Sequence, residues 1–146
     1  MKKKLLSTLV LPLLMVSLSS GYAASTLNTT ASFAPNVAGL GVAYETQLTP
    51  RFSLEGGAAF STEGVYHLFG GVNTKLSKDF YIPARVGLVN NIVVLGADNY
   101  YYATVGLGAK LPVNKDVSVF AEMNSNVYPA VTFPQPRVGL KLNLQK

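Results

Sequence analysis

Apolar residues occur at every second position through most of the chain from Ser25 onward. This spacing is the period of a β-strand, in which neighbouring side chains point to opposite faces, and not that of a helix. The alternation forms eight runs, which span residues 27–33, 40–44, 52–60, 66–76, 80–88, 101–111, 117–123 and 138–144. The pattern therefore predicts an all-β domain of eight strands, with a bulge or local break at Pro83 because proline cannot donate to a strand ladder.

The connectors between the runs are of two kinds. Compact turns at residues 49–51, 77–79 and 112–116 each lead into a strand that begins Phe-Ser, Phe-Tyr or Val-Ser, a weak internal hairpin repeat. The others are residues 34–36, 61–64, 90–99 and 124–135. We expect 90–99 to extend its hairpin and turn at Asp98-Asn99, and 124–135 to be a loop that exposes Tyr128 and Phe133. Tight turns at one end and mostly longer loops at the other are typical of an outer-membrane barrel.

The polar face of the strands indicates which side of the sheet meets lipid. It carries small residues rather than the Thr, Lys and Glu of a solvated strand, namely Gly39, Gly41, Ala43, Gly57, Ala59, Gly71, Gly87, Gly106, Gly108 and Gly139. Glycine weakens a strand and packs nothing, but the narrow lumen of an eight-stranded barrel needs small residues to make room for a few large ones. We therefore expect this face to line the lumen and the apolar face to meet acyl chains.

Charged residues of both signs share the glycine face. They are Glu45, Glu55 and Glu122 against Lys75, Arg85, Lys110, Arg137 and Lys141. Because buried charges must be paired, we predict that these eight residues form an ionic network that plugs the lumen. The simpler interpretation, that they are solvated surface charges, stays open at this point. Since side chains fill a lumen of eight strands, we do not expect bulk diffusion through it.

Aromatic residues gather near the ends of the predicted strands. If the N-terminus lies in the periplasm, Tyr44, Phe52 and Phe80 fall at the lower rim of the barrel and Phe33, Phe60, Tyr66 and Tyr101 at the upper rim. Two aromatic girdles around an aliphatic band are what the two membrane interfaces favour. The prediction is an eight-stranded antiparallel up-and-down transmembrane β-barrel.

The first residues have the features of a cleavable export signal. Lys2, Lys3 and Lys4 precede an apolar run from Leu5 to Leu18, and small residues precede a cleavage point after Ala23. We therefore expect residues 1–23 to be a signal peptide and residues 24–146 to be the barrel. Removing three lysines leaves nine basic and seven acidic residues, so the formal charge falls from +5 to about +2. No basic cluster remains, which opposes a nucleic-acid partner.

Taken together, these features resemble the small eight-stranded outer-membrane proteins of the OmpA transmembrane-domain and OmpX kind, or the opacity and YfaZ-like groups. The resemblance covers the whole mature chain and is one of architecture, without a family-specific motif. It implies location in the cell outer membrane, contact with outer-membrane lipids, insertion by the barrel assembly machinery, and a monomer. Such proteins usually end in an aromatic residue that the machinery reads, whereas this chain ends in Lys146.

Three functional hypotheses follow. The first is a non-enzymatic barrel with a structural or surface-interaction role. The second is an outer-membrane lipid-modifying hydrolase that uses His67, the only histidine, with Ser61 and Glu63 nearby in sequence. The third is a soluble, lipocalin-like periplasmic binder. We expect neither a cofactor nor a metal, since one histidine and no cysteine leave no set of metal ligands.

Overall fold

The computed structural model describes residues 24–34, 37–62, 64–91, 100–128 and 130–144. The predicted signal peptide, residues 92–99 with the expected turn at Asp98-Asn99, residue Glu63 and the terminal Lys146 lie outside these ranges. Among the described residues, no helix has both the length and the apolar character needed to cross a membrane.

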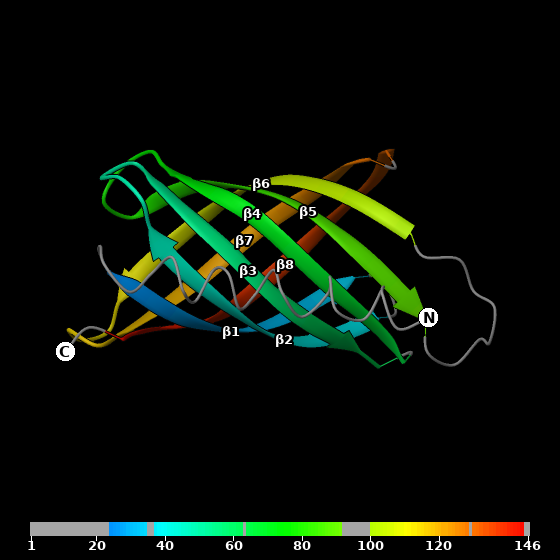
Figure 1. Cartoon of the computed structure of the whole chain (residues 1–146), viewed down its shortest axis with the longest axis horizontal. Coiled ribbons are helices and arrows are strands. Elements are labelled where there is room, and N and C mark those ends of the chain that lie inside the picture. Colours follow the sequence, from blue (N-terminus) through cyan, green and yellow to red (C-terminus); the bar gives the residue numbers. More distant parts are fainter. Residues whose placement is uncertain (1–23, 35–36, 63, 92–99, 129, 145–146) are drawn as a thin grey trace, which may run out of the picture.

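Eight strands follow one another along the chain and close into one antiparallel barrel, in which each strand pairs with its sequence neighbours and the first pairs with the last (Figure 1). The predicted all-β, up-and-down barrel is therefore confirmed. The strands are β1 (Ser25–Ala34), β2 (Val37–Gln47), β3 (Phe52–Ser61), β4 (Val65–Lys75), β5 (Phe80–Asn91), β6 (Tyr100–Pro112), β7 (Val117–Tyr128) and β8 (Ala130–Asn143).

The barrel has a polar interior and an apolar exterior. Among the described residues only three hydrophobic side chains are buried, Ala43, Tyr81 and Phe120, against thirteen polar or charged ones. Leu107 and Leu140 are 53% and 43% exposed, and they belong to a set of twenty large hydrophobic residues that are exposed among the described residues. This arrangement is the reverse of a barrel that is stable in water, whose apolar side chains would meet inside.

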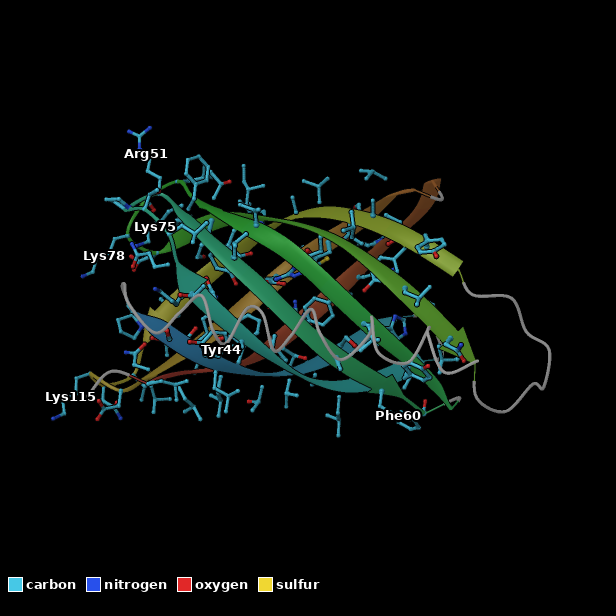
Figure 2. All side chains as sticks on the ribbon, in the orientation of Figure 1. Tyr44, Arg51, Phe60, Lys75, Lys78 and Lys115 are labelled. Atoms are coloured by element: carbon cyan, nitrogen blue, oxygen red, sulfur yellow. The ribbon has the colours of Figure 1, made fainter. Side chains whose placement is uncertain are left out.

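Three turns of identical hydrogen bonding close one end of the barrel, at residues 48–51, 76–79 and 113–116. In each turn the first two backbone N–H groups donate to the carbonyl of the residue that begins the next strand, at 2.9 and 3.1 Å. A side-chain oxygen of the second turn residue, from Thr49, Ser77 or Asn114, accepts two further backbone N–H bonds. The predicted hairpin repeat is thus a repeat of turn geometry. We call this end the turn end; Arg51, Lys78 and Lys115 mark it (Figure 2).

The opposite end, the loop end, differs from the sequence-based prediction. Residues 124–135 are not a long loop, because β7 continues to Tyr128 and β8 already begins at Ala130. Asn124 pairs with Gln135 whereas Asn126 pairs with Val131, so the ladder shifts register and β8 carries extra residues there. Such a bulge accommodates Pro134, whose missing N–H would otherwise leave a gap in the ladder. The side chains of Tyr128 and Phe133 lie outside the described part.

Pro83 interrupts one of its two ladders, as expected. It pairs with Asn73 of β4, but on the other side the pairing of β5 with β6 skips from Tyr81–Gly108 to Ala84–Val105. The register is the same before and after the gap, so the interruption is a break and not a bulge.

Candidate functional site

Two glutamates and two arginines from four different strands meet in the middle of the lumen. Arg85 Nη2 lies 2.6 Å from Glu55 Oε2 and 2.9 Å from Glu122 Oε1. Arg137 reaches the same two carboxylates at 3.3 Å and 3.4 Å. The glutamate side chains are only 1% exposed. The four charges cancel, so the cluster has no net charge and each ion has a partner of opposite sign.

Glycines on intervening strands allow these contacts to form. In register, Glu55 lies opposite Gly71, and Gly71 lies opposite Arg85 on the next strand. A Cβ on Gly71 would lie 2.7 Å from Arg85 Cγ, so a larger residue would push the guanidinium away. The same arrangement recurs where Tyr81 OH donates to Glu122 Oε1 at 2.7 Å across Gly108. Because glycines alternate with large residues around the barrel, side chains from strands that are not neighbours can form hydrogen bonds and ion pairs.

Neutral residues complete the cluster. Asn73 and Asn124 donate to Glu55 and Glu122 at 3.2 and 3.3 Å. The guanidinium of Arg137 lies over the rings of Phe69 and Phe120, at 5.1 and 5.9 Å from their centroids, within the range of a cation–π contact. We define the central cluster as Glu55, Arg85, Glu122, Arg137 and the neutral side chains that bond to or stack on them.

A second ion pair lies closer to the turn end. Lys141 Nζ is 2.6 Å from Glu45 Oε2, and Asn28 and Ser53 also donate to this carboxylate. Lys75 and Lys110 were also predicted to belong to the ionic network, and neither forms an ion pair within 4.0 Å with an acidic residue of the described ranges. Both lie where their strands approach the turn end, whereas Glu55 and Glu122 belong to the central cluster and Glu45 is paired with Lys141.

Two cavities occupy the lumen on either side of the central cluster. The turn-end cavity has a volume of about 120 Å³ and is lined by Glu45, Lys75, Lys110 and Lys141 among others. The loop-end cavity is larger, about 330 Å³, and is lined by His67, Phe69, Arg85 and Arg137 among others. The two cavities share no lining residue, and neither is lined by Glu55, Glu122 or Phe120. The central cluster therefore lies between them.

The aromatic residues predicted to form girdles lie near the two rims. Phe52 and Phe80 begin β3 and β5 directly after turns, and Tyr44 lies in β2, where its hydroxyl donates to Ser25 Oγ at 2.7 Å. At the loop end, Phe60 pairs across strands with Tyr66, and Tyr101 near the start of β6 is 71% exposed. Figure 2 shows Phe60 at the end away from Lys78 and Lys115. The side chain of Phe33 lies outside the described part.

Two of the three residues of the hydrolase hypothesis, Ser61 and His67, are described, and no hydrogen bond joins them; Glu63 lies outside the described residues. Ser61 and His67 both line the loop-end cavity. Ser61 Oγ is buried without a hydrogen-bond partner among the described residues, and His67 makes an edge-to-face contact with Tyr102 at 5.9 Å. A serine nucleophile requires a hydrogen bond to its base, so this geometry is not that of an assembled triad.

Sequence reasoning missed the uncharged members of the central cluster. Tyr81, Phe69 and Phe120 are large aromatic residues at lumen-facing positions, and Asn73 and Asn124 are amides at such positions. Tyr81, Phe120, Asn73 and Asn124 each lie an even number of residues from a predicted inward-facing charge on the same strand. Phe69 lies two residues from the inward-facing Gly71. The strand period therefore also identifies these uncharged residues as inward-facing, but the prediction considered only charged ones.

No protein-family model and no curated protein sequence matches the chain. Solved structures do match it. A de novo designed transmembrane β-barrel superimposes with a TM-score of 0.64 at 17% identity, covering 86% of this chain and 99% of the design. Another design, TMB2.3, gives a TM-score of 0.61 at 18% identity, covering 87% and 98%. The Yersinia pestis outer membrane protein Ail in a phospholipid nanodisc gives 0.58 at 10% identity, covering 84% and 100%.

These likenesses establish the fold. The chain has the architecture of small transmembrane β-barrels along nearly the whole length of each matched structure. At such identities the comparison does not extend to the specific OmpA-like or OmpX-like groups, which stay a prediction.

Proposed function

We propose that this chain is a monomeric barrel of the Gram-negative outer membrane, with a lumen closed to bulk diffusion and a structural or surface-interaction role rather than an enzymatic one. Its outer wall contacts outer-membrane lipids, and the barrel assembly machinery inserts it. The apolar exterior supports the membrane part of this proposal. Likeness to an outer membrane protein, Ail, supports the location.

We infer the closed lumen from the central cluster. Glu55 and Glu122 are almost fully buried, and they are held by two arginines that cross the lumen from β5 and β8. Phe120, which is 2% exposed, fills the space beside Arg137. An ion that passed would have to displace paired and largely buried charges, which costs several kcal/mol. A role at the membrane surface, in lipid contact or through the loop end, fits such a closed scaffold.

Recording in planar bilayers tests the closed lumen. The unmodified protein is expected to show no large, steady conductance. The double variant Phe120→Ala, Arg137→Ala removes a ring and a guanidinium from the constriction and is expected to conduct. Retained heat-modifiable migration on gels shows that the variant is folded. Steady conductance from the unmodified protein would overturn the closed lumen.

Labelling in intact cells tests the location and orientation. Thr62 is exposed at the loop end and Lys78 is exposed in a turn. Cysteines introduced at these positions are expected to differ: Thr62→Cys reacts with a membrane-impermeant maleimide, whereas Lys78→Cys reacts only after the outer membrane is permeabilised. Equal labelling of both in intact cells contradicts the orientation, and release of the protein by carbonate washing contradicts membrane insertion.

A further inference from the structure

The loop-end cavity is lined by arginine and aromatic side chains and, among the described residues, by no acid. Its two cations are Arg85 and Arg137, whereas the two carboxylates with which they pair do not line it. Phe60 and Tyr101, which are 55% and 71% exposed, also belong to the lining. The cavity therefore extends from the central cluster to the rim of the loop end. Its volume of about 330 Å³ is that of a pocket for a small organic molecule.

Arg137 is paired less tightly than Arg85. Arg85 donates to the two carboxylates through Nε, Nη1 and Nη2 over distances between 2.6 and 3.0 Å, as charge-assisted hydrogen bonds do. Arg137 reaches the same carboxylates only at 3.3 and 3.4 Å, through Nη2 and Nη1, and its Nε donates to no described residue. Since a guanidinium group has five N–H donors, Arg137 keeps donors for a ligand.

The accessible part of Arg137 faces the loop-end cavity. Its side chain is 10% exposed, and it lines this cavity but not the turn-end cavity. In the described part of the chain, the buried side-chain atoms without a hydrogen-bond partner belong to Ser61, Asn73 and Asn124. Arg137 Nε also lacks a partner but is not one of these atoms, so it is not buried. A ligand that enters from the loop end can therefore reach this guanidinium group.

Three rings form a wall of the cavity beside Arg137. The ring of Phe69 lies 5.1 Å from Arg137 Cζ. Gly87 of β5 pairs with Phe69 on one side and with Tyr102 on the other, and a Cβ on Gly87 would overlap the Tyr102 ring. The Tyr102 ring therefore covers Gly87, next to Phe69. His67 contacts Tyr102 edge to face at 5.9 Å, and all three ring residues line the cavity.

This arrangement fits a flat, singly charged anion. The planar fork of a guanidinium group matches a carboxylate, and aromatic side chains pack well against another ring. Of the two cations in the described lining, Arg85 already bonds through all three nitrogens, which leaves Arg137 as the one with spare donors. One such cation suits a carboxylate better than a doubly charged phosphate. Because a cavity of about 150 Å³ holds benzene, this one has room for two fused rings.

We propose that the loop-end cavity is a binding site for a small aromatic carboxylate, whose carboxylate pairs with Arg137 and whose rings lie against His67, Phe69 and Tyr102. The site lies between the central cluster and the loop end, so it does not depend on whether the lumen conducts. It goes beyond the structural or surface-interaction role, because it assigns a class of small ligand to the chain.

Isothermal titration of the full protein in phosphatidylcholine nanodiscs with 2-naphthoate tests the proposal near neutral pH, and empty nanodiscs correct for partitioning into lipid. Saturable binding of one naphthoate per protein is expected. The neutral 2-naphthamide is expected to bind at least about tenfold more weakly, because it loses the charge-assisted pair with Arg137. Equal binding of the amide, or no saturable binding of naphthoate, overturns the proposal.

Two ligands of one ring test the aromatic contact without changing the protein. Benzoate and cyclohexanecarboxylate carry the same charge, and only benzoate has a flat ring that packs against the aromatic wall. Benzoate is expected to bind more tightly than cyclohexanecarboxylate by at least about threefold. Equal affinities would overturn the assignment to an aromatic ligand.

Arg137→Lys tests the guanidinium while it keeps the charge of the central cluster. Naphthoate binding is expected to weaken by at least about fivefold, because lysine lacks the planar fork. Arg51→Lys is the matched control, since Arg51 is an exposed turn residue outside the lining, and it is expected to bind naphthoate as the unmodified protein does. Heat-modifiable migration on gels checks that each variant is folded. Unchanged affinity in Arg137→Lys overturns the role of this residue.

Tyr102→Leu tests the aromatic wall independently of the ion pairs. It is expected to weaken naphthoate binding by at least about fivefold, because the ring beside the ligand is lost. Tyr66→Leu is the matched control, since Tyr66 pairs with Phe60 at the same end of the barrel and does not line the cavity. Equal weakening in the two variants, or none in Tyr102→Leu, overturns the proposed site.

Discussion

The middle of the lumen and its turn end are built from the same kind of residue at the same kind of position, yet they differ in charge. In the middle, two carboxylates meet two guanidinium groups, and the planar forks of Arg85 and Arg137 each contact both acids. At the turn end, Lys75 and Lys110 have no described acid within ion-pair distance, and Lys141 already uses Glu45. Charge at an inward position therefore does not by itself imply a closed ionic network.

The difference shows how position along the barrel axis decides the role of a charge. A side chain in the middle is surrounded by all eight strands and must find a partner or remain as a costly buried ion. A lysine beside the turns keeps its ammonium at the mouth, where water or a ligand solvates it. The first arrangement contributes stability and blocks the lumen, whereas the second leaves charge available for binding.

The largest effect is expected from removing a cation from the middle rather than from the turn end. Arg85→Met leaves Glu55 and Glu122 with Arg137 alone, and breaking a buried pair in this way costs about 3–5 kcal/mol. Lys110→Met removes an unpaired charge and is expected to change the free energy of unfolding by less than about 0.5 kcal/mol, or to raise it. Urea unfolding in phosphatidylcholine vesicles measures both. Equal losses would show that the two regions do not differ in this way.

A cation placed on the outer wall extends the comparison to the lipid face. Val86 and Leu48 are 65% and 57% exposed, so in water both would accept arginine equally well. Val86 lies in the middle of β5, where arginine is expected to cost about 2–4 kcal/mol in a bilayer, whereas Leu48 lies in a turn, where the cost is about 0–1 kcal/mol. The same unfolding measurement compares Val86→Arg with Leu48→Arg. Equal changes in the free energy of unfolding for the two variants would contradict insertion in a membrane.

Packing in the middle is tested by filling the space that one glycine leaves. A Cβ on Gly108 would overlap the ring of Tyr81, whose hydroxyl bonds to Glu122. Gly108→Val is therefore expected to displace the ring and to cost about 1–3 kcal/mol. The tyrosine near-UV circular dichroism signal should also change. Ala121→Val introduces the same side chain on the exposed outer face of β7 and serves as the control, with little expected effect. A stable Gly108→Val with an unchanged spectrum would contradict the packing described.

The smallest effect is expected from the turns, which stabilise the turn end without using charge. Asn114 Oδ1 accepts the backbone N–H groups of Asp116 and Val117 at 2.8 and 2.9 Å. Because water can replace these exposed bonds in part, Asn114→Ala is expected to lower the free energy of unfolding by about 0.5–1 kcal/mol. Lys115→Ala in the same turn is the control. A loss in the lysine variant as large as in the asparagine variant would assign the stability of the turn to charge.

Much of the fold could be predicted because the strand period is local. Alternation placed Leu107 and Leu140 on one face and the glycines on the other, the glycines and charges of the polar face identified it as the inner one, and the structure agrees. The turns were equally readable, since each has its own acceptor side chain within four residues. Residues 124–135 misled the prediction because prolines interrupt the pattern, and only pairing with β7 reveals that the strand continues around a bulge.

The sequence by itself determined the strands, the turns and which side chains face inward, because these depend on neighbours a few residues apart. Only the tertiary structure decided which inward charges meet. Glu55 and Arg137 are 82 residues apart in the chain, and Lys141 and Glu45 are 96 apart. Closure of the barrel and the register of each strand pair set the height of every side chain in the lumen. For that reason six of the predicted charges found partners, and two lysines remained at the mouth.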